Sequence, residues 1–220
     1  MNTLEIKKFY NTFDFENMIT NPPKLIQEFL DGEVKFVKEH LVKGKTILEI
    51  GCGYGRLLEI LSGSAKKVVG IDFSQRMISL AKERLKNHSN VEVDIMEANA
   101  LKFEDNFFDY VVCLDNSFGN MPNIEEEVIR EMKRVCKKDG EIIISVFSEN
   151  AKDSQIENYK RIGLTEVKDT GKAIRTGEGF YSRRFEKKEL IDIFEKIGLK
   201  CRIIRVSPIN YIALSINRKT

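Results

Sequence analysis

The sequence predicts an α/β fold: a seven-stranded, mostly parallel, doubly wound sheet that ends in an antiparallel hairpin. Three observations predict it. Short apolar runs rich in β-branched residues alternate with helical patterns along most of the 220-residue chain. The central run EIIISVF is continuously apolar, as a strand covered on both faces must be. Near the end, two apolar runs are separated by a turn too short for a parallel return.

The elements are expected in the following order. Strands are expected at residues 46–50, 68–71, 91–96, 110–114 and 141–147. A helix begins at Pro22–Pro23, and the helices between strands each have one apolar face. Ser74 is the expected N-cap of the helix after the second strand. A last helix ends at Gly198, and CRIIRV and YIALSI then form the hairpin.

The composition indicates a globular chain, with 42% hydrophobic and 32% charged residues and a net charge of +2. The near balance of charge gives no general attraction to nucleic acid or to an anionic membrane. No stretch approaches the roughly 18 apolar residues of a membrane span. The four cysteines are scattered, which favours a reducing, cytoplasmic compartment, and no cluster has the spacing of metal ligands, so no metal is expected.

A glycine-rich turn, EIGCGYGR, follows the first strand. Its glycines are Gly51, Gly53 and Gly55, and position 56 is Arg, so the turn lacks the third glycine of G-x-G-x-x-G and also lacks a P-loop GK[ST]. The second strand ends in Asp72, 19 residues after Gly53. A carboxylate there can accept both hydroxyls of a ribose. The alternative is that Asp72 is only a turn residue at the end of the strand, and its spacing from Gly53 would then be a coincidence.

The E-x-G-x-G-x-G turn resembles motif I of the class I S-adenosylmethionine-dependent methyltransferases. Three further stretches are similar to family motifs in the same order: VVGIDFSQRMI, MEANALKFEDNFFDYVVC and IREMKRVCKKDGEIIIS. The resemblance covers residues 47–147 and the terminal hairpin. It implies the class I methyltransferase fold, with S-adenosyl-L-methionine as cofactor and S-adenosyl-L-homocysteine as product.

The resemblance also implies which residues bind the cofactor. From motif I and the strand ends they are Glu49, Gly51, Cys52, Gly53, Gly55, Arg56, Asp72 and Leu114. Phe73 and Met77 would flank the adenine, and Glu97 would accept from its amino group beside Ala98. Glu97 stands where the family has Asp, and Lys102 where it has Pro. Tyr10, in the aromatic N-terminal stretch FYNTFDF, would cover the cofactor.

In this family the acceptor binds after the fourth strand, here CLDNSFGNM. Its register parallels the [DN]-P-P-[YF] motif of enzymes that methylate amino groups, but without the prolines. N-S-F is more similar to the glycine N-methyltransferase-like, methyltransferase type 11 group. Asp115 is therefore the expected catalytic residue, which positions the acceptor or takes a proton, and Asn116 and Phe118 the expected substrate contacts. The alternative is that Asn116 and Ser117 only cap the loop.

Residues 148–184 form a long insertion with one helical pattern near 156–159, followed by a stretch rich in Gly, Lys and Arg. It is either a solvated loop or a lid at the ligand-binding edge of the sheet. A lid would bring Tyr181 and Arg184 to the acceptor. Together with Arg175 and Arg183, Arg184 would then suit an acidic substrate.

We expect a single methyltransferase domain. Residues 1–43 would form a helical cap, 44–147 the cofactor-binding core, 148–184 the insertion, and 185–220 the last helix and hairpin. The favoured function is N- or O-methylation of a small-molecule acceptor by direct in-line transfer. An RNA- or protein-modifying enzyme is second, supported by the basic segment KAIRTGEGFYSRR. A non-catalytic S-adenosylmethionine-binding protein is third, disfavoured by the full set of cofactor motifs.

Overall fold

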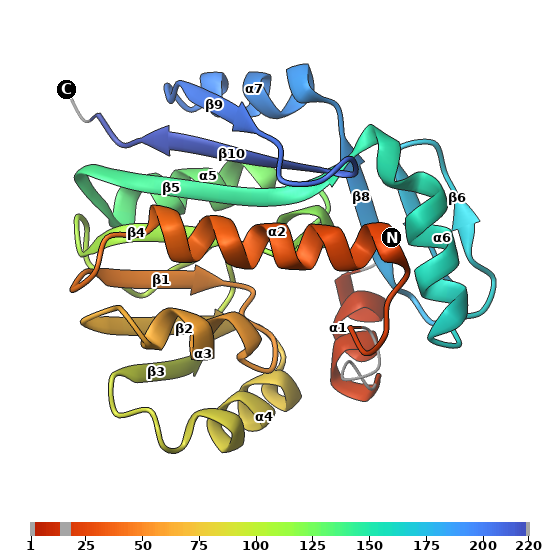
Figure 1. Ribbon diagram of the computed structural model, residues 1–220, viewed down its shortest axis with the longest axis horizontal. Helices are drawn as coiled ribbons and strands as arrows, with labels where there is room; N and C mark the ends of the chain where they lie inside the picture. The colour runs from red at the N-terminus through yellow and green to blue at the C-terminus, as the bar shows by residue number, and fades with distance from the viewer. Residues whose placement is uncertain (1–2, 14–18, 219–220) are drawn as a thin grey trace.

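The computed structural model describes residues 3–13 and 19–218, and its centre is the expected doubly wound sheet (Figure 1). Seven strands run in the spatial order β3 (Val91–Ile95), β2 (Lys67–Asp72), β1 (Thr46–Ile50), β4 (Phe108–Cys113), β5 (Cys136–Ser148), β10 (Asn210–Ile216) and β9 (Cys201–Ile204). The first five are mutually parallel. β10 is antiparallel to both β5 and β9, which confirms the predicted hairpin.

Helices cover both faces of this sheet. One face packs against α2 (Lys24–His40), α3 (Arg56–Ser62) and α4 (Gln75–Leu85), and the other against α5 (Glu125–Val135) and α7 (Lys187–Lys196). Neighbouring strand residues enter opposite cores: Ile47 packs with the first group and Leu48 with the second. Because both faces are buried, the central strands β4 and β5 contain long apolar runs in the sequence.

Three predicted helix boundaries are confirmed. α2 begins directly after Pro23. The Ser74 hydroxyl caps α4 by accepting a hydrogen bond from Met77 N at 3.2 Å. Gly198, with φ of +71°, lies just beyond the end of α7, where the left-handed conformation that ends a helix favours glycine.

The insertion, residues 148–184, does not form the irregular solvated loop that was one of the two expectations for it. It contains α6 (Lys152–Arg161) and three short strands, β6 (Lys168–Asp169), β7 (Ala173–Arg175) and β8 (Tyr181–Phe185). β5 pairs with β4 only as far as Ile144. Beyond that point the same edge of β5 pairs with β8, through Phe147↔Arg184. Strands of two to five residues, with arginines among them, are too short for their alternation to be recognised in the sequence.

α1 (Thr3–Thr12) lies beyond the carboxyl ends of β1 and β2 (Figure 1). The backbone carbonyl of Tyr10 accepts a hydrogen bond from Ser74 Oγ at 3.1 Å, and the Phe9 ring lies 5.1 Å from the Phe180 ring. α1 therefore joins the α4 side of the sheet to the insertion. In the described part of the chain, no helix combines the length and apolar character needed to cross a membrane.

Candidate active site

A cavity lies at the carboxyl ends of β1, β2 and β4, where α1, α2 and α6 close over them. It brings together most of the residues that the sequence predicted for the site: Tyr10, Glu49, Gly51, Cys52, Gly53, Arg56, Asp72, Phe73, Met77, Ala98, Leu114, Asp115 and Asn116. These side chains come from five separate stretches of the chain. Their convergence follows from the parallel sheet, whose strands end at the same edge.

The glycine turn supplies room for a ligand. Gly51 has φ of +72° and lies so close to the loop after β4 that a Cβ would be 2.8 Å from Ser117 Cβ. Ser117 Oγ also donates to Gly51 O at 3.0 Å, which fixes the two loops together. At Gly53, with φ of +53°, no described atom lies within 4 Å of where a Cβ would be. The turn is thus tightly packed at its start and opens into the cavity at Gly53.

Asp72 is held at the end of β2 with its carboxylate at the cavity. Its two oxygens accept hydrogen bonds from Gly53 N at 3.1 Å and from Ser74 N at 2.8 Å. Burial raises the pKa of Asp72 to about 6, although these two backbone donors act in the opposite direction. Each oxygen can accept a further hydrogen bond. This arrangement suits the two neighbouring hydroxyls of a ribose.

Glu49 lies at the end of β1 and is 3% exposed. Its Oε2 atom has no hydrogen-bond partner in the described structure, although it is buried. Burial raises the pKa of Glu49 well above its ordinary value, and Arg56 opposes that rise. An unpartnered carboxylate oxygen at a cavity wall calls for a cationic or hydrogen-bonding ligand group. Glu49, the space at Gly53 and the carboxylate of Asp72 together fit the amino group, the methionine portion and the ribose of S-adenosylmethionine.

Asp115 is held in place by two other charged residues. Arg56 Nη2 donates to Asp115 Oδ2 at 2.8 Å, and the same nitrogen lies 3.7 Å from Glu33 Oε2. Asp115 N donates to Glu33 Oε1 at 2.8 Å. Glu33 is fully buried in α2, and burial, followed by the charge of Asp115, raises its pKa to about 7. Arg56 thus binds protein carboxylates, in addition to its place in the cavity wall.

Sequence reasoning missed Glu33 and the apolar wall beside it. Ile26, Phe29, Leu30 and Glu33 lie on the buried face of α2, and the first three line the cavity. The signal was a carboxylate in register with an apolar helix face, where an unpaired charge would be costly. The remaining wall residues include Phe147, Asn158, Tyr159 and Phe180, which no motif marks.

The loop after β4 has an unusual backbone. Asp115 and Asn116 both have positive φ, +50° and +57°, which is uncommon for residues other than glycine. The buried Asn116 side chain stabilises this conformation: its Oδ1 accepts from Phe147 N at 2.9 Å and its Nδ2 donates to Ser182 Oγ at 3.0 Å. Asn116 therefore ties the loop to β5 and β8, in addition to lining the cavity.

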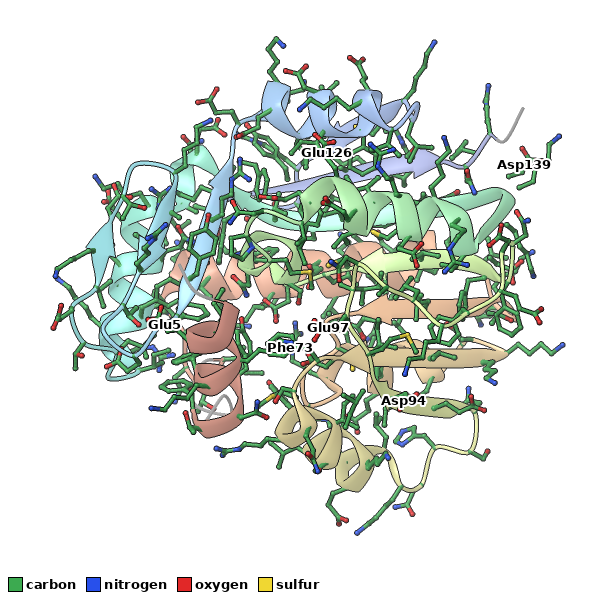
Figure 2. The ribbon with its side chains drawn as sticks, turned by 180° about the vertical axis from the view of Figure 1, so that it is seen from behind. Glu5, Phe73, Asp94, Glu97, Glu126 and Asp139 are labelled. Atoms are coloured by element: carbon green, nitrogen blue, oxygen red, sulfur yellow. The ribbon has the colours of Figure 1, made fainter. Side chains whose placement is uncertain are left out.

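Five predicted site residues lie outside the cavity lining: Gly55, Glu97, Phe118, Tyr181 and Arg184. Gly55 precedes α3, and a Cβ there would lie 2.8 Å from Leu85 Cδ1. Glu97 pairs with Lys7 of α1, whose ammonium also lies 6.0 Å from the centre of the Phe73 ring. Figure 2 shows Glu97 and Phe73 between α1 and the sheet. The roles in ligand binding that the sequence predicted for these five residues stay predictions.

Phe118, Tyr181 and Arg184 have structural contacts. The buried Phe118 ring packs 5.7 Å from Phe185. Tyr181 is half-buried, and the guanidinium of Arg175 lies 5.7 Å from its ring. Arg184 is 4% exposed. It donates to Gln155 Oε1 at 2.9 Å, to Asp169 and to a backbone carbonyl.

Comparison with known proteins agrees with this geometry. Residues 47–140 match a family model described as a methyltransferase domain. A demethylmenaquinone methyltransferase from Bacillus cereus is 31% identical over 182 residues, which cover 76% of this chain and 74% of the relative. The PH0226 protein of Pyrococcus horikoshii shares the fold with a TM-score of 0.72 and 23% identity, covering 96% of this chain and 98% of that one. A SAM-dependent methyltransferase from Aquifex aeolicus has a TM-score of 0.67 and 21% identity, covering 93% and 99%.

The order of motifs, the sheet topology, the cavity at the strand ends and these similarities lead to one assignment. The chain belongs to the class I S-adenosylmethionine-dependent methyltransferases and is an enzyme of that family, with S-adenosyl-L-methionine as its cofactor.

Proposed function

We propose that this methyltransferase acts on a small-molecule acceptor that is uncharged and largely apolar, and that it methylates a nitrogen or oxygen of that molecule by direct in-line transfer. The observation that carries this proposal is the wall of the cavity beside Asp115. There α2 contributes Ile26, Phe29 and Leu30, and the end of β5 contributes Phe147.

This wall favours an apolar ligand. Phe29 is fully buried, and its ring meets that of Phe147 edge-on with centroids 5.1 Å apart. Enclosed pockets lined by aromatic and aliphatic side chains, with a few polar groups, are typical sites for small molecules. Burial of apolar area contributes about 25 cal/mol per Å² to binding.

The charges of the cavity argue against an anionic acceptor. Of the described lining residues, Arg56 is the only basic one, and it is already paired with Asp115 and lies near Glu33. The acidic lining residues are Glu49, Asp72 and Asp115. In the insertion, Arg183 is paired with Glu125 and Glu189, and Arg184 with Asp169. An anion in the cavity would therefore meet carboxylates without a basic side chain available to neutralise it.

The chain's own task in such a reaction is alignment. S-adenosylmethionine supplies an already activated methyl group when bound, so the protein has to hold the acceptor in line with it and exclude water. We assign to Asp115, which hydrogen-bonds to Arg56 and Glu33, the task of orienting an acceptor N–H or O–H and receiving its proton. The name of the Bacillus cereus relative, a demethylmenaquinone methyltransferase, supports a small-molecule acceptor.

Methyl-labelled S-adenosylmethionine, incubated with the enzyme and a cell extract, tests the proposal. We expect label in the low-molecular-weight, solvent-extractable fraction, with turnover that changes little with salt. Label in RNA, with affinity that falls steeply between about 50 and 200 mM salt, would instead show an RNA substrate bound by its phosphates. Label in the protein fraction would likewise contradict the proposal.

A further inference from the structure

Three hydrogen-bonding groups surround one buried hydroxyl beside the cavity. Ser182 Oγ, on β8, lies 3.0 Å from Asn116 Nδ2, 2.9 Å from Gln155 Nε2 and 2.8 Å from the hydroxyl oxygen of Tyr159. Ser182 and Gln155 are fully buried, and Tyr159 is 3% exposed and lines the cavity. The protons of this cluster can be assigned from its chemistry.

One backbone N–H and one guanidinium N–H fix the orientation of the two side-chain amides. Phe147 N donates to Asn116 Oδ1 at 2.9 Å, so the amide nitrogen of Asn116 must face Ser182. Arg184 Nη1 donates to Gln155 Oε1 at 2.9 Å, so the amide nitrogen of Gln155 faces Ser182 as well. A backbone N–H and a guanidinium N–H donate and never accept, so neither amide can be reversed without loss of a buried hydrogen bond.

The remaining protons follow by counting. A serine hydroxyl has two acceptor positions and one hydrogen. The two amides fill both acceptor positions of Ser182, so its hydrogen is donated to the Tyr159 oxygen at 2.8 Å. The Tyr159 proton then cannot point at Ser182. Nor can it point at Gln155 Nε2, which lies 3.5 Å away and is itself a donor.

We propose that the Tyr159 hydroxyl is a hydrogen-bond donor directed into the acceptor side of the cavity, and that the acceptor molecule carries an uncharged carbonyl oxygen that receives this bond. A carbonyl accepts without donating, which matches a tyrosine that has only its proton to offer. This inference rests on the proposed small-molecule function and adds a recognition group to it. Burial raises the pKa of Tyr159 to about 12, so the hydroxyl keeps its proton over the physiological range.

A pair of probes with and without a carbonyl tests this assignment. α-Tetralone and tetralin share one bicyclic skeleton, and only the first has a carbonyl. Their affinities are measured by calorimetry on protein saturated with S-adenosylhomocysteine. Tyr159→Phe should lower the ratio of tetralone to tetralin affinity about two- to tenfold, the effect of one neutral hydrogen bond. Tyr110→Phe, which removes a hydroxyl that bonds Val42 N outside the cavity lining, should leave the ratio as in the wild type.

An unchanged ratio in Tyr159→Phe, in protein that still binds S-adenosylhomocysteine normally, would overturn the proposal. A second measurement does not depend on a variant. The ¹³C resonance of carbonyl-labelled α-tetralone should move downfield on binding to the wild type, relative to its position in an apolar solvent, and a bound resonance without that shift would contradict the assignment. Both readouts report binding, so label entering RNA in the turnover assay would overturn the proposed function without affecting this result.

Discussion

At the scale of single residues, we expect the buried carboxylate of Asp72 to make cofactor binding depend on pH. Its pKa is raised to about 6, mainly by burial, and only the ionised form can accept from both ribose hydroxyls without losing its backbone hydrogen bonds. The affinity for S-adenosylhomocysteine should therefore be full above about pH 7 and fall as the pH drops through 6.

Asp72→Asn provides the matched comparison. At pH 8 the variant should bind more weakly by about 1.5–3 kcal/mol, the usual contribution of a hydrogen bond to a charged group. The difference from the wild type should shrink toward pH 5, where Asp72 is protonated. Calorimetric titrations at the two pH values measure it. A difference that stays constant with pH would show that the carboxylate charge of Asp72 does not take part.

Glu33 should make the folded state less stable as the pH rises. Burial raises its pKa from 4.5 to about 7, so folding favours the protonated form. The stability due to this group is fully present below pH 4.5 and is lost as the pH rises through 7. Glu33→Gln can still accept from Asp115 N through its amide oxygen and does not titrate.

The variant should therefore match the wild type near pH 4.5 and exceed it in free energy of unfolding at pH 8. A melting temperature a few degrees higher corresponds to about 1 kcal/mol in a protein of this size. Urea denaturation across the pH range measures the trend. Equal pH dependence in both proteins would mean that the pKa of Glu33 is the same in the folded and unfolded states.

The sequence was informative for residues that lie in motifs and uninformative for those that do not. Glu49 was predicted because it belongs to the E-x-G-x-G-x-G turn that resembles the family motif, and Asp72 because it ends the second strand 19 residues after Gly53; both line the cavity. Glu33 and Tyr159 come from helices outside every motif, and their importance depends on partners far away in the sequence. Hydrogen bonds between distant segments leave no local pattern to read.

At the scale of elements, the glycine turn after β1 shows how one backbone conformation serves the site. Gly53 and Gly44 both have positive φ, +53° and +75°, and neither has a described neighbour within 4 Å of an added Cβ. Only Gly53 lines the cavity. Alanine at either position should cost about 1–2 kcal/mol of stability through the left-handed backbone.

Cofactor affinity should separate the two variants. Gly53→Ala places a methyl group in the ligand's space and should weaken S-adenosylhomocysteine binding tenfold or more, whereas Gly44→Ala should bind as the wild type does. Calorimetry, with thermal melting to verify equal stability losses, tests this. Equal affinities would mean that the ligand does not approach the turn at Gly53.

Elements with a clear period were predicted and the short strands were not. The five parallel strands and the hairpin strands each have four or more residues and carry buried or partly buried apolar side chains, so their pattern is visible locally. β8 has the sequence YSRRF, yet it forms because the end of β5 offers an unpaired edge. That edge exists only in the assembled sheet, so the sequence of β8 alone did not reveal it.

At the scale of the whole molecule, the insertion is attached to the sheet through Arg184. This buried side chain reaches α6 through Gln155, β6 through Asp169 and the following turn through Gly171 O. β8, which carries it, pairs with the end of β5. One guanidinium thus joins α6, β6 and β8, and it does so from outside the cavity lining.

Arg184→Ala should therefore lower the free energy of unfolding and leave the affinity for ligands unchanged. The substitution leaves Asp169 and Gln155 without their partner, and breaking a buried ion pair costs about 3–5 kcal/mol; the 19% exposure of the Asp169 side chain places the expected loss at the low end. Arg184→Lys keeps a charge near Asp169 but cannot bridge to Gln155, so it should lose less. Urea denaturation gives the ranking, and S-adenosylhomocysteine affinity of the folded fraction should not change. A fully stable Arg184→Ala protein with a raised acceptor KM would instead support the role in acceptor binding that the sequence suggested.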